Sequence, residues 1–201
     1  MNPRTLAVLA ITAGALVVTA CGQSSPPETG ANATPPQAPA QASDSKQLII
    51  QGFAAPVPAA WVATQPGSTM RVAQFALPGA AGAEAGEVVA YFFPSGQGGP
   101  QEANIERWAS QFVSADGQPV TPAITAEKAG DTEVTLVELH GTYARGVGMG
   151  PTGEAKPDQS LLSAMVETPI GRITLQMYGP SKTVAGEREH FLKLAKGFRP
   201  A

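Results

Sequence analysis

The chain has 201 residues with a formal net charge of -3, and hydrophobic and charged residues make up 43% and 14% of it. This composition is typical of a globular protein with a single folded domain. The Lys and Arg residues are scattered singly, so the basic clusters that neutralise phosphates are missing and no nucleic-acid partner is expected.

The chain has few cysteines and histidines that could serve as metal ligands. Cys21 is the single cysteine, which excludes an intramolecular disulfide and a zinc site built from cysteines. The two histidines, His140 and His190, lie far apart in the sequence on different predicted elements. The sequence therefore predicts no metal and no cofactor, and it predicts ordinary surface or partly buried imidazoles.

Residues 1–20 have the three parts of a secretory signal peptide. A short polar start carries one cation, Arg4, an apolar run extends from Leu6 to Val18, and small residues follow. The apolar run is too short for a comfortable membrane span, which needs about 20 residues. The alternative is an uncleaved apolar helix that buries Cys21.

The sequence Val18-Thr19-Ala20-Cys21 resembles the lipobox of bacterial lipoproteins. The resemblance implies that Cys21 becomes the first residue of the mature protein, with a diacylglyceryl thioether and an acylated amino group, and palmitate is expected among the acyl chains. Each buried methylene contributes about 0.8 kcal/mol, so several chains can anchor a domain without a spanning helix. Gly22 stands where lipoproteins retained in the inner membrane have Asp, which implies an outer-membrane anchor facing the periplasm.

Residues 21–46 predict a disordered tether that follows this anchor. They are rich in Pro, Ala, Ser and Gln and have no apolar periodicity, so they cannot bury enough surface to offset the cost of ordering the chain. In extended polyproline geometry, at about 3.1 Å per residue, the tether would reach roughly 75 Å. That length would let the domain stand off a membrane.

The folded domain is predicted to occupy residues 47–201 and to begin with strands. Apolar or alternating patterns predict strands at residues 48–50, 71–77 and 88–93. The third is apolar on both faces and rich in β-branched and aromatic residues, which indicates a central strand covered on both sides.

A glycine-rich turn and an amphipathic helix follow this strand directly. Pro100 suits the first position of the helix, and the spacing of the apolar residues defines one helical face. The residues of this face are Ile105, Trp108, Ala109 and Phe112.

The second half of the chain predicts a long strand and a hairpin. Residues 133–143 form a strand whose apolar parity shifts, which indicates either a bulge or burial on both faces. In residues 161–178, pairing Thr168 with Gly171 places three apolar pairs on one face and so fixes the hairpin register. The pairs are Val166 with Ile173, Ala164 with Leu175, and Leu162 with Met177.

A closing helix completes the predicted fold. Ser181 is suited to cap a helix over residues 182–196, after which Phe198 is expected to pack back onto the sheet. The predicted class is therefore α+β, with an antiparallel sheet of about six strands packed with two helices.

Several segments of this domain resemble known families. The opening residues Phe53, Pro58 and Trp61 and the closing Gly197-Phe198-Arg199-Pro200 are similar to the PsbP/Mog1-like superfamily. Three further segments look like a set of uncharacterised bacterial lipoproteins: Gly96-Gln97-Gly98-Gly99, Asn104-Ile105-Glu106-Arg107-Trp108 and Gln111-Phe112. The resemblance implies a protein that acts by binding, and it brings no catalytic residues with it.

The candidate ligand-binding residues are Gly98, Gly99, Arg107 and Trp108. The backbone amides of the two glycines precede a helix and could hold an anion, although the turn lacks the Lys-Ser/Thr ending of a phosphate loop. Trp108 could form the floor of a pocket. The competing interpretations are a tight turn for the glycines, a core position for Trp108 and a solvated helix face for Arg107.

The sequence has no catalytic motif, so the chain is not expected to be an enzyme. The favoured function is a lipid-anchored accessory module that acts through a protein partner, with the long loop of residues 146–159 as a candidate partner surface. A small-ligand carrier is an alternative, which would need a pocket between helix and sheet lined by side chains such as Trp108. A hydrolase is the other alternative, and it would need a Ser or Asp beside His140 or His190.

Replacing Cys21 removes the thiol that the predicted acylation requires. A Cys21→Ser variant is expected to incorporate no labelled fatty acid, and its precursor should be released or left unprocessed. Metabolic labelling with an alkyne palmitate analogue measures this outcome. Unchanged labelling of the variant in the membrane fraction would contradict the lipoprotein prediction.

Overall fold

The structure, a computed structural model, describes residues 46–143 and 154–201. Residues Ala42–Ala201 belong to one compact unit. The predicted signal peptide, Cys21 and the tether up to residue 45 lie outside the described residues. Among the described helices, none is long and apolar enough to cross a membrane.

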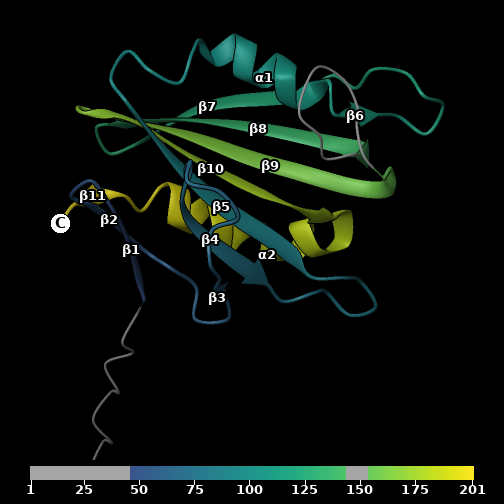
Figure 1. The fold of residues 1–201 in the computed structure, drawn as a ribbon, viewed down its shortest axis with the longest axis horizontal. Coiled ribbons are helices and arrows are strands. Elements are labelled where there is room, and N and C mark those ends of the chain that lie inside the picture. The colour runs from purple at the N-terminus through teal and green to yellow at the C-terminus, as the bar shows by residue number, and fades with distance from the viewer. Residues whose placement is uncertain (1–45, 144–153) are drawn as a thin grey trace, which may run out of the picture. The chain divides into compact units, whose positions relative to one another are not determined.

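The strands of the described chain form two antiparallel sheets (Figure 1). The smaller sheet has the order β1-β2-β11. The larger, eight-stranded sheet has the order β3-β4-β5-β10-β9-β8-β6, and β7 also pairs with β8. The strand bounds are β1 Gln47–Ile50, β2 Phe53–Pro56, β3 Val62–Ala63, β4 Arg71–Leu77, β5 Gly86–Pro94, β6 Phe112–Val113, β7 Ala123–Ala129, β8 Thr132–Tyr143, β9 Lys156–Thr168, β10 Gly171–Pro180 and β11 Arg199–Pro200.

Two helices lie on opposite faces of the larger sheet (Figure 1). The first, α1 (Gln101–Ala109), buries Ile105 and Trp108, and the second, α2 (Ser181–Ala195), buries Phe191 and Leu194 among other residues. The prediction of an α+β fold with two helices is confirmed.

The prediction of about six strands is wrong, because the described chain has eleven. Three of the missed strands, β3, β6 and β11, have two residues each, which is too short for a two-residue period to be visible. A fourth, β7, is mostly exposed on both faces and has no apolar stripe.

The hairpin of β9 and β10 has the predicted register. Val166 faces Ile173, Ala164 faces Leu175, and Leu162 faces Met177, and all six side chains are buried. The turn is closed by the Thr168 hydroxyl, which donates a hydrogen bond to the Gly171 carbonyl oxygen at 2.5 Å. Matching apolar parity on the two arms selects this pairing over a slipped one.

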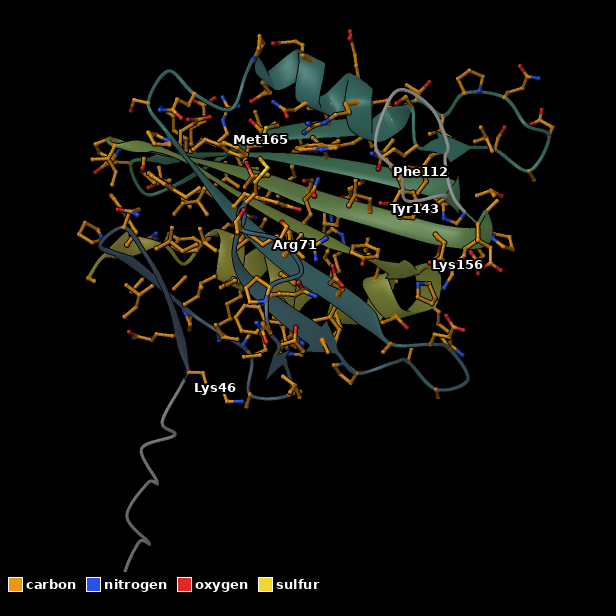
Figure 2. All side chains as sticks on the ribbon, viewed as in Figure 1. Lys46, Arg71, Phe112, Tyr143, Lys156 and Met165 are labelled. Atoms are coloured by element: carbon orange, nitrogen blue, oxygen red, sulfur yellow. The ribbon has the colours of Figure 1, made fainter. Side chains whose placement is uncertain are left out.

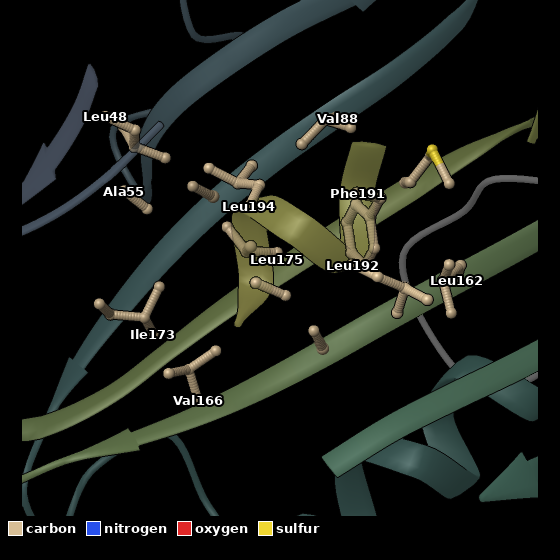
Figure 3. Close-up of a cluster of buried hydrophobic side chains, with 14 of the residues drawn as sticks. Leu48, Ala55, Val88, Leu162, Val166, Ile173, Leu175, Phe191, Leu192 and Leu194 are labelled. Carbon is tan, nitrogen blue, oxygen red and sulfur yellow. The ribbon is translucent and has the colours of Figure 1, made fainter. Parts of the chain in front are cut away.

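The main hydrophobic core fills the space between the larger sheet and α2 (Figure 3). It joins side chains of β5, β9 and β10 to Phe191 of α2 and to Leu48 of the smaller sheet. Trp61 is fully buried in it, and its Nε1–H donates a hydrogen bond to Glu187 Oε2 at 2.7 Å. Phe198 also packs here, as predicted.

Strand β8 is buried on both faces, which explains its shift of apolar parity. Val134 and Leu136 belong to the core on the α2 side, whereas Val137 and Leu139 belong to a second cluster on the α1 side. The irregularity in its pairing with β9 lies further along the strand. Burial on both faces is therefore the correct one of the two alternatives.

The helix ends differ from the prediction in three places. Helix α1 ends at Ala109, so Phe112 lies in β6 and not on the helical face. Pro100 is the N-cap residue and not the first helical residue. Ser181 is the first residue of α2 and not its N-cap, which is Pro180, and the Ser181 hydroxyl contacts His140.

Gly171 is expected to tolerate no larger residue. Its φ is +147°, and a Cβ there would lie 2.2 Å from the Phe93 carbonyl oxygen of β5. Gly171→Ala should therefore lower the free energy of unfolding by about 2 kcal/mol or more. Urea denaturation of the variant and the parent measures the change.

Gly186, inside α2, supplies the matched control. Nothing lies within 4 Å of a Cβ at this position. Gly186→Ala is expected to raise the stability by about 0.5–1 kcal/mol, because alanine favours the helix. Similar unfolding free energies for the two variants would contradict the packing of β10 against β5.

Candidate functional site

The face of the larger sheet on the α1 side carries an open cavity of about 540 Å³. Figure 2 shows the side chains around it, with Arg71 labelled on β4 and Tyr143 on β8. The strands β5 and β10 form its floor, and α1 and the start of β4 form its walls. Its floor residues are Tyr91, Phe93, Arg172, Thr174, Gln176 and Tyr178, and its wall residues include Met70, Arg71, Asn104, Arg107 and Trp108. We call it the aromatic–arginine cavity.

The alternation of side chains along the strands creates the floor of this cavity. In β10, Ile173, Leu175 and Met177 point into the core on the α2 side, so the residues between them face the cavity. Helix α1 has only nine residues, and its buried side chains pack on β8 and β9, against Val137 and Met165. The part of the sheet formed by β5 and β10 is therefore left open.

Aromatic rings form most of the apolar lining. All three tyrosines of the protein, Tyr91, Tyr143 and Tyr178, line the cavity. The rings of Tyr91 and Phe93 stack with centroids 6.3 Å apart, and those of Tyr143 and Tyr178 lie 6.0 Å apart. Trp108 is 5% exposed and belongs both to the α1-side core and to the cavity wall. Such rings offer a large apolar contact area to a ligand.

The charged residues of the lining are all arginines. No Asp, Glu or Lys occurs among the described lining residues. Arg71 Nη1 lies 3.1 Å from Glu87 Oε1, and Arg172 Nε forms an ion pair with Glu167, so carboxylates beside the cavity balance these two charges. Arg107 has no carboxylate within ion-pair distance in the described part of the chain. Among the described residues, the guanidinium of Arg107 is therefore the one in the lining that lacks a carboxylate partner.

Three of the four predicted ligand-binding residues, Gly98, Arg107 and Trp108, lie together in the cavity lining. Gly99 is outside the lining, and its carbonyl oxygen accepts a hydrogen bond from Arg172 Nη1 at 3.4 Å. The Gly98 carbonyl oxygen accepts one from Asn104 Nδ2 at 2.8 Å. Anion binding by the backbone amides of this turn stays a prediction.

The residues on the sheet side of the cavity were missed by the sequence reasoning. A signal for them exists in β10, where Thr174, Gln176 and Tyr178 alternate with fully buried apolar residues. The neighbouring strand β5 was expected to be covered on both faces. A polar stripe beside such a strand indicates a partly open face.

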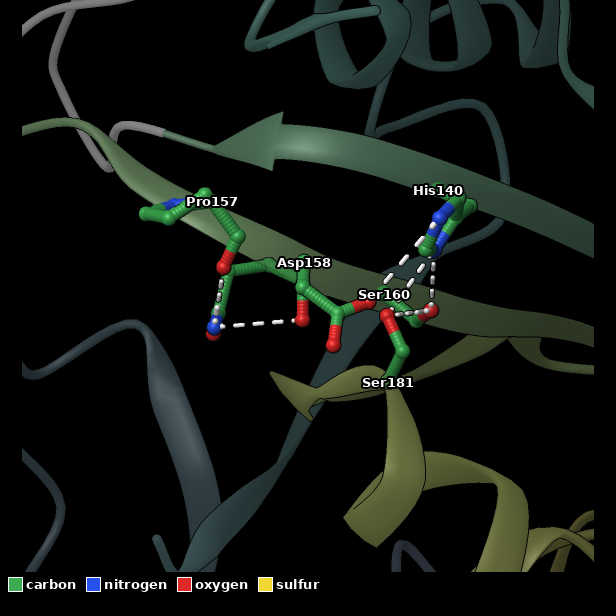
Figure 4. Close-up of polar contacts among 6 residues, drawn as sticks. His140, Pro157, Asp158, Ser160 and Ser181 are labelled. Carbon is green, nitrogen blue, oxygen red and sulfur yellow. Dashed lines mark hydrogen bonds and ion pairs between the residues drawn. The ribbon is translucent and has the colours of Figure 1, made fainter. Parts of the chain in front are cut away.

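A second pocket, of about 350 Å³, lies on the other face of the sheet and contains His140. Ser181 Oγ lies 2.8 Å and Ser160 Oγ 3.3 Å from His140 Nδ1, and Asp158 Oδ1 lies 4.0 Å from its Nε2 (Figure 4). The hydrolase alternative required a Ser or Asp beside one of the histidines, and this cluster supplies both.

The geometry of the His140 cluster differs from that of a catalytic triad. Two hydroxyls share one ring nitrogen, and the Asp158 carboxylate is beyond hydrogen-bond distance from the other. The side chains of His140 and Asp158 are 65% and 76% exposed, so water screens their interaction. Nearby, Arg188 of α2 donates a hydrogen bond from Nη2 to Glu138 Oε1 of β8, and this contact joins the helix to the strand. The same hydrogen bond raises the pKa of Arg188 above its ordinary value.

The remaining sequence predictions concern a metal site, His190 and the loop of residues 146–159. The described residues contain no group of three or more side chains that could hold a metal ion. His190 Nδ1 lies 2.9 Å from Glu187 Oε2 at the surface of α2. The end of the predicted partner loop, from residue 156, belongs to β9, and residues 146–153 of that loop lie outside the described residues.

The fold and the cavity together define an α+β protein with a ligand-sized cavity on one face of its sheet. The sequence matches no protein-family model and no curated protein.

Solved structures with a similar fold include LpqN of Mycobacterium tuberculosis, described as involved in cell envelope biogenesis, with 11% identity, a TM-score of 0.45 and coverage of 79% of this chain and 86% of that one. The cyanobacterial PsbP of Synechocystis has 11% identity, a TM-score of 0.48 and coverage of 78% and 92%. The Pseudomonas aeruginosa protein PA94, a putative regulator of unknown function, has 14% identity, a TM-score of 0.39 and coverage of 78% and 97%. Likenesses this distant assign no function, so the residues of the cavity carry the interpretation.

Proposed function

We propose that the chain is a non-catalytic, lipid-anchored protein of the cell envelope whose domain binds a small ligand in the aromatic–arginine cavity. The observation that carries this proposal is the cavity itself, open between α1 and the sheet and lined by aromatic rings and arginines. Its volume of about 540 Å³ falls in the range of small-molecule sites, roughly 300–1,000 Å³. A few polar groups among mostly apolar ones are the usual composition of such sites.

The proposed location in the envelope rests on the N-terminal sequence. The signal peptide of residues 1–20, Cys21 with its acyl chains and the tether of residues 21–46 would hold the domain at the outer membrane on its periplasmic side. Membership of the PsbP/Mog1-like superfamily belongs to the same proposal and rests on the sequence segments that resemble it. A protein partner would then receive or deliver the ligand.

A dye-binding assay tests the cavity. The protein used begins at Gly22, because this chain contains the compact unit Ala42–Ala201 and lacks the acylation site. N-phenyl-1-naphthylamine, a neutral aromatic dye that brightens in apolar surroundings, is expected to bind saturably at one site. The absence of saturable binding would overturn the proposed function.

Two glycines of the same turn provide matched variants for this assay. Gly98 and Gly96 have φ values of +83° and +79°, so alanine is equally strained at both. Only at Gly98 would a Cβ meet a neighbour, the Phe93 ring, at 2.7 Å from Cγ. Gly98→Ala is therefore expected to weaken dye binding at least about threefold, or roughly 0.7 kcal/mol, whereas Gly96→Ala should leave it unchanged. Equal effects of the two variants would place the dye elsewhere.

Hydrolysis is a second candidate function, favoured by the contact of Ser181 and Ser160 with His140. We expect no catalysis there, because Asp158 does not orient the imidazole and the cluster is open to water. A fluorophosphonate probe, which labels activated serines, should therefore leave the protein unlabelled. Labelling that is lost in Ser181→Ala and in His140→Gln would contradict this expectation and establish a nucleophilic serine.

A further inference from the structure

The charges of the aromatic–arginine cavity narrow the class of ligand. We propose that the cavity binds an amphiphilic monoanion, a compound with an apolar body and one carboxylate or phosphodiester group, and that Arg107 pairs with the anionic group. This inference rests on the proposed function and adds to it the chemistry of the ligand.

The charge balance of the lining supports a single negative charge on the ligand. Of the three guanidinium groups, those of Arg71 and Arg172 already pair with Glu87 and Glu167 beside the cavity. Gln74 also accepts a hydrogen bond from Arg71, at 2.8 Å, so that arginine is held against the sheet. The remaining cation is the one on α1, and one anionic group would balance it.

Arg107 is held in place by an amide whose orientation is fixed. Its Nη2 donates a hydrogen bond to Asn104 Oδ1 at 2.7 Å. Asn104 Nδ2 in turn donates to the carbonyl oxygens of Gly98 and Pro100, at 2.8 and 2.9 Å. Because these two carbonyls can only accept, the amide must direct its oxygen toward Arg107. The hydrogen bond to Asn104 uses one of the five guanidinium N–H groups and leaves others for a planar or tetrahedral anion.

The rest of the cavity suits an apolar body. Tyr91 and Phe93 form a stacked pair on the floor, and Trp108 stands in the α1 wall. Met70, 64% exposed, provides a flexible apolar side chain at the opposite wall. A ligand that placed its apolar part here would have its anionic group within reach of the α1 wall, where Arg107 lies.

A pair of dyes that share one body tests the charge preference. N-phenyl-1-naphthylamine and 8-anilinonaphthalene-1-sulfonate differ only in the sulfonate, so the difference in their affinities measures what the negative charge contributes. The anionic dye is expected to bind more tightly to the chain that begins at Gly22. Relative to the neutral dye, Arg107→Gln should weaken binding of the anionic dye about fivefold, the upper range for a solvent-accessible ion pair.

Two further variants control this comparison. Lys193→Gln removes one positive charge from the exposed surface of α2, on the other face of the sheet, and is expected to change neither affinity. Arg107→Lys keeps the charge but loses the planar fork, and it should restore part of the affinity for the anionic dye. The monoanion proposal is wrong if the neutral dye binds but the anionic dye binds no more tightly, or if Arg107→Gln does not reduce the difference between the two affinities. In either case the proposed function stands. If neither dye binds, the proposed function fails.

Competition identifies the source of the ligand. Dodecanoate represents an acyl chain from a lipid, 1-naphthoate a soluble aromatic acid, and inorganic phosphate a bare anion. Displacement of the anionic dye by either carboxylate supports the proposal. The stronger competitor then shows whether the cavity prefers an acyl chain or an aromatic ring system as the apolar body. Displacement by phosphate alone would overturn it, because a bare anion site needs no aromatic lining.

Discussion

The hairpin of β9 and β10 lies at the centre of the larger sheet, and its register decides what each face of the domain contains. With Val166 opposite Ile173 and Ala164 opposite Leu175, every large aliphatic side chain of the second arm falls on the α2 side. The same register sends Arg172, Thr174 and Gln176 to the other side. A slip of one residue would exchange the two sets, so the core and the cavity depend on one pairing.

The two faces are covered unequally, and the cavity follows from that inequality. Helix α2 has 15 residues and buries six of them, whereas α1 has nine and buries two. The buried side chains of the shorter helix pack with residues of β8 and β9, whereas residues of β5 and β10 line the cavity. The uncovered area is too polar for a second core and too aromatic for an ordinary solvated face. This combination of rings and polar groups is what the proposed binding site rests on.

The sequence predicted what depends on local period and turn chemistry. The hairpin register followed from the period of two and the turn between Thr168 and Gly171, and the position of Trp108 on the buried face of a helix was also readable. Phe112 was misassigned because its spacing continues the helical period after the helix has ended. The contact between His140 and Ser181 could not be foreseen, because it depends on how β8, β9 and the start of α2 meet in space.

The hydrogen bonds of Asn104 have a consequence for the kinetics of any ligand that Arg107 binds. The guanidinium is oriented in the free protein, so association would not have to pay the entropy of ordering that side chain. Related ligands would then have similar association rate constants, and their affinities would differ mainly through their dissociation rate constants.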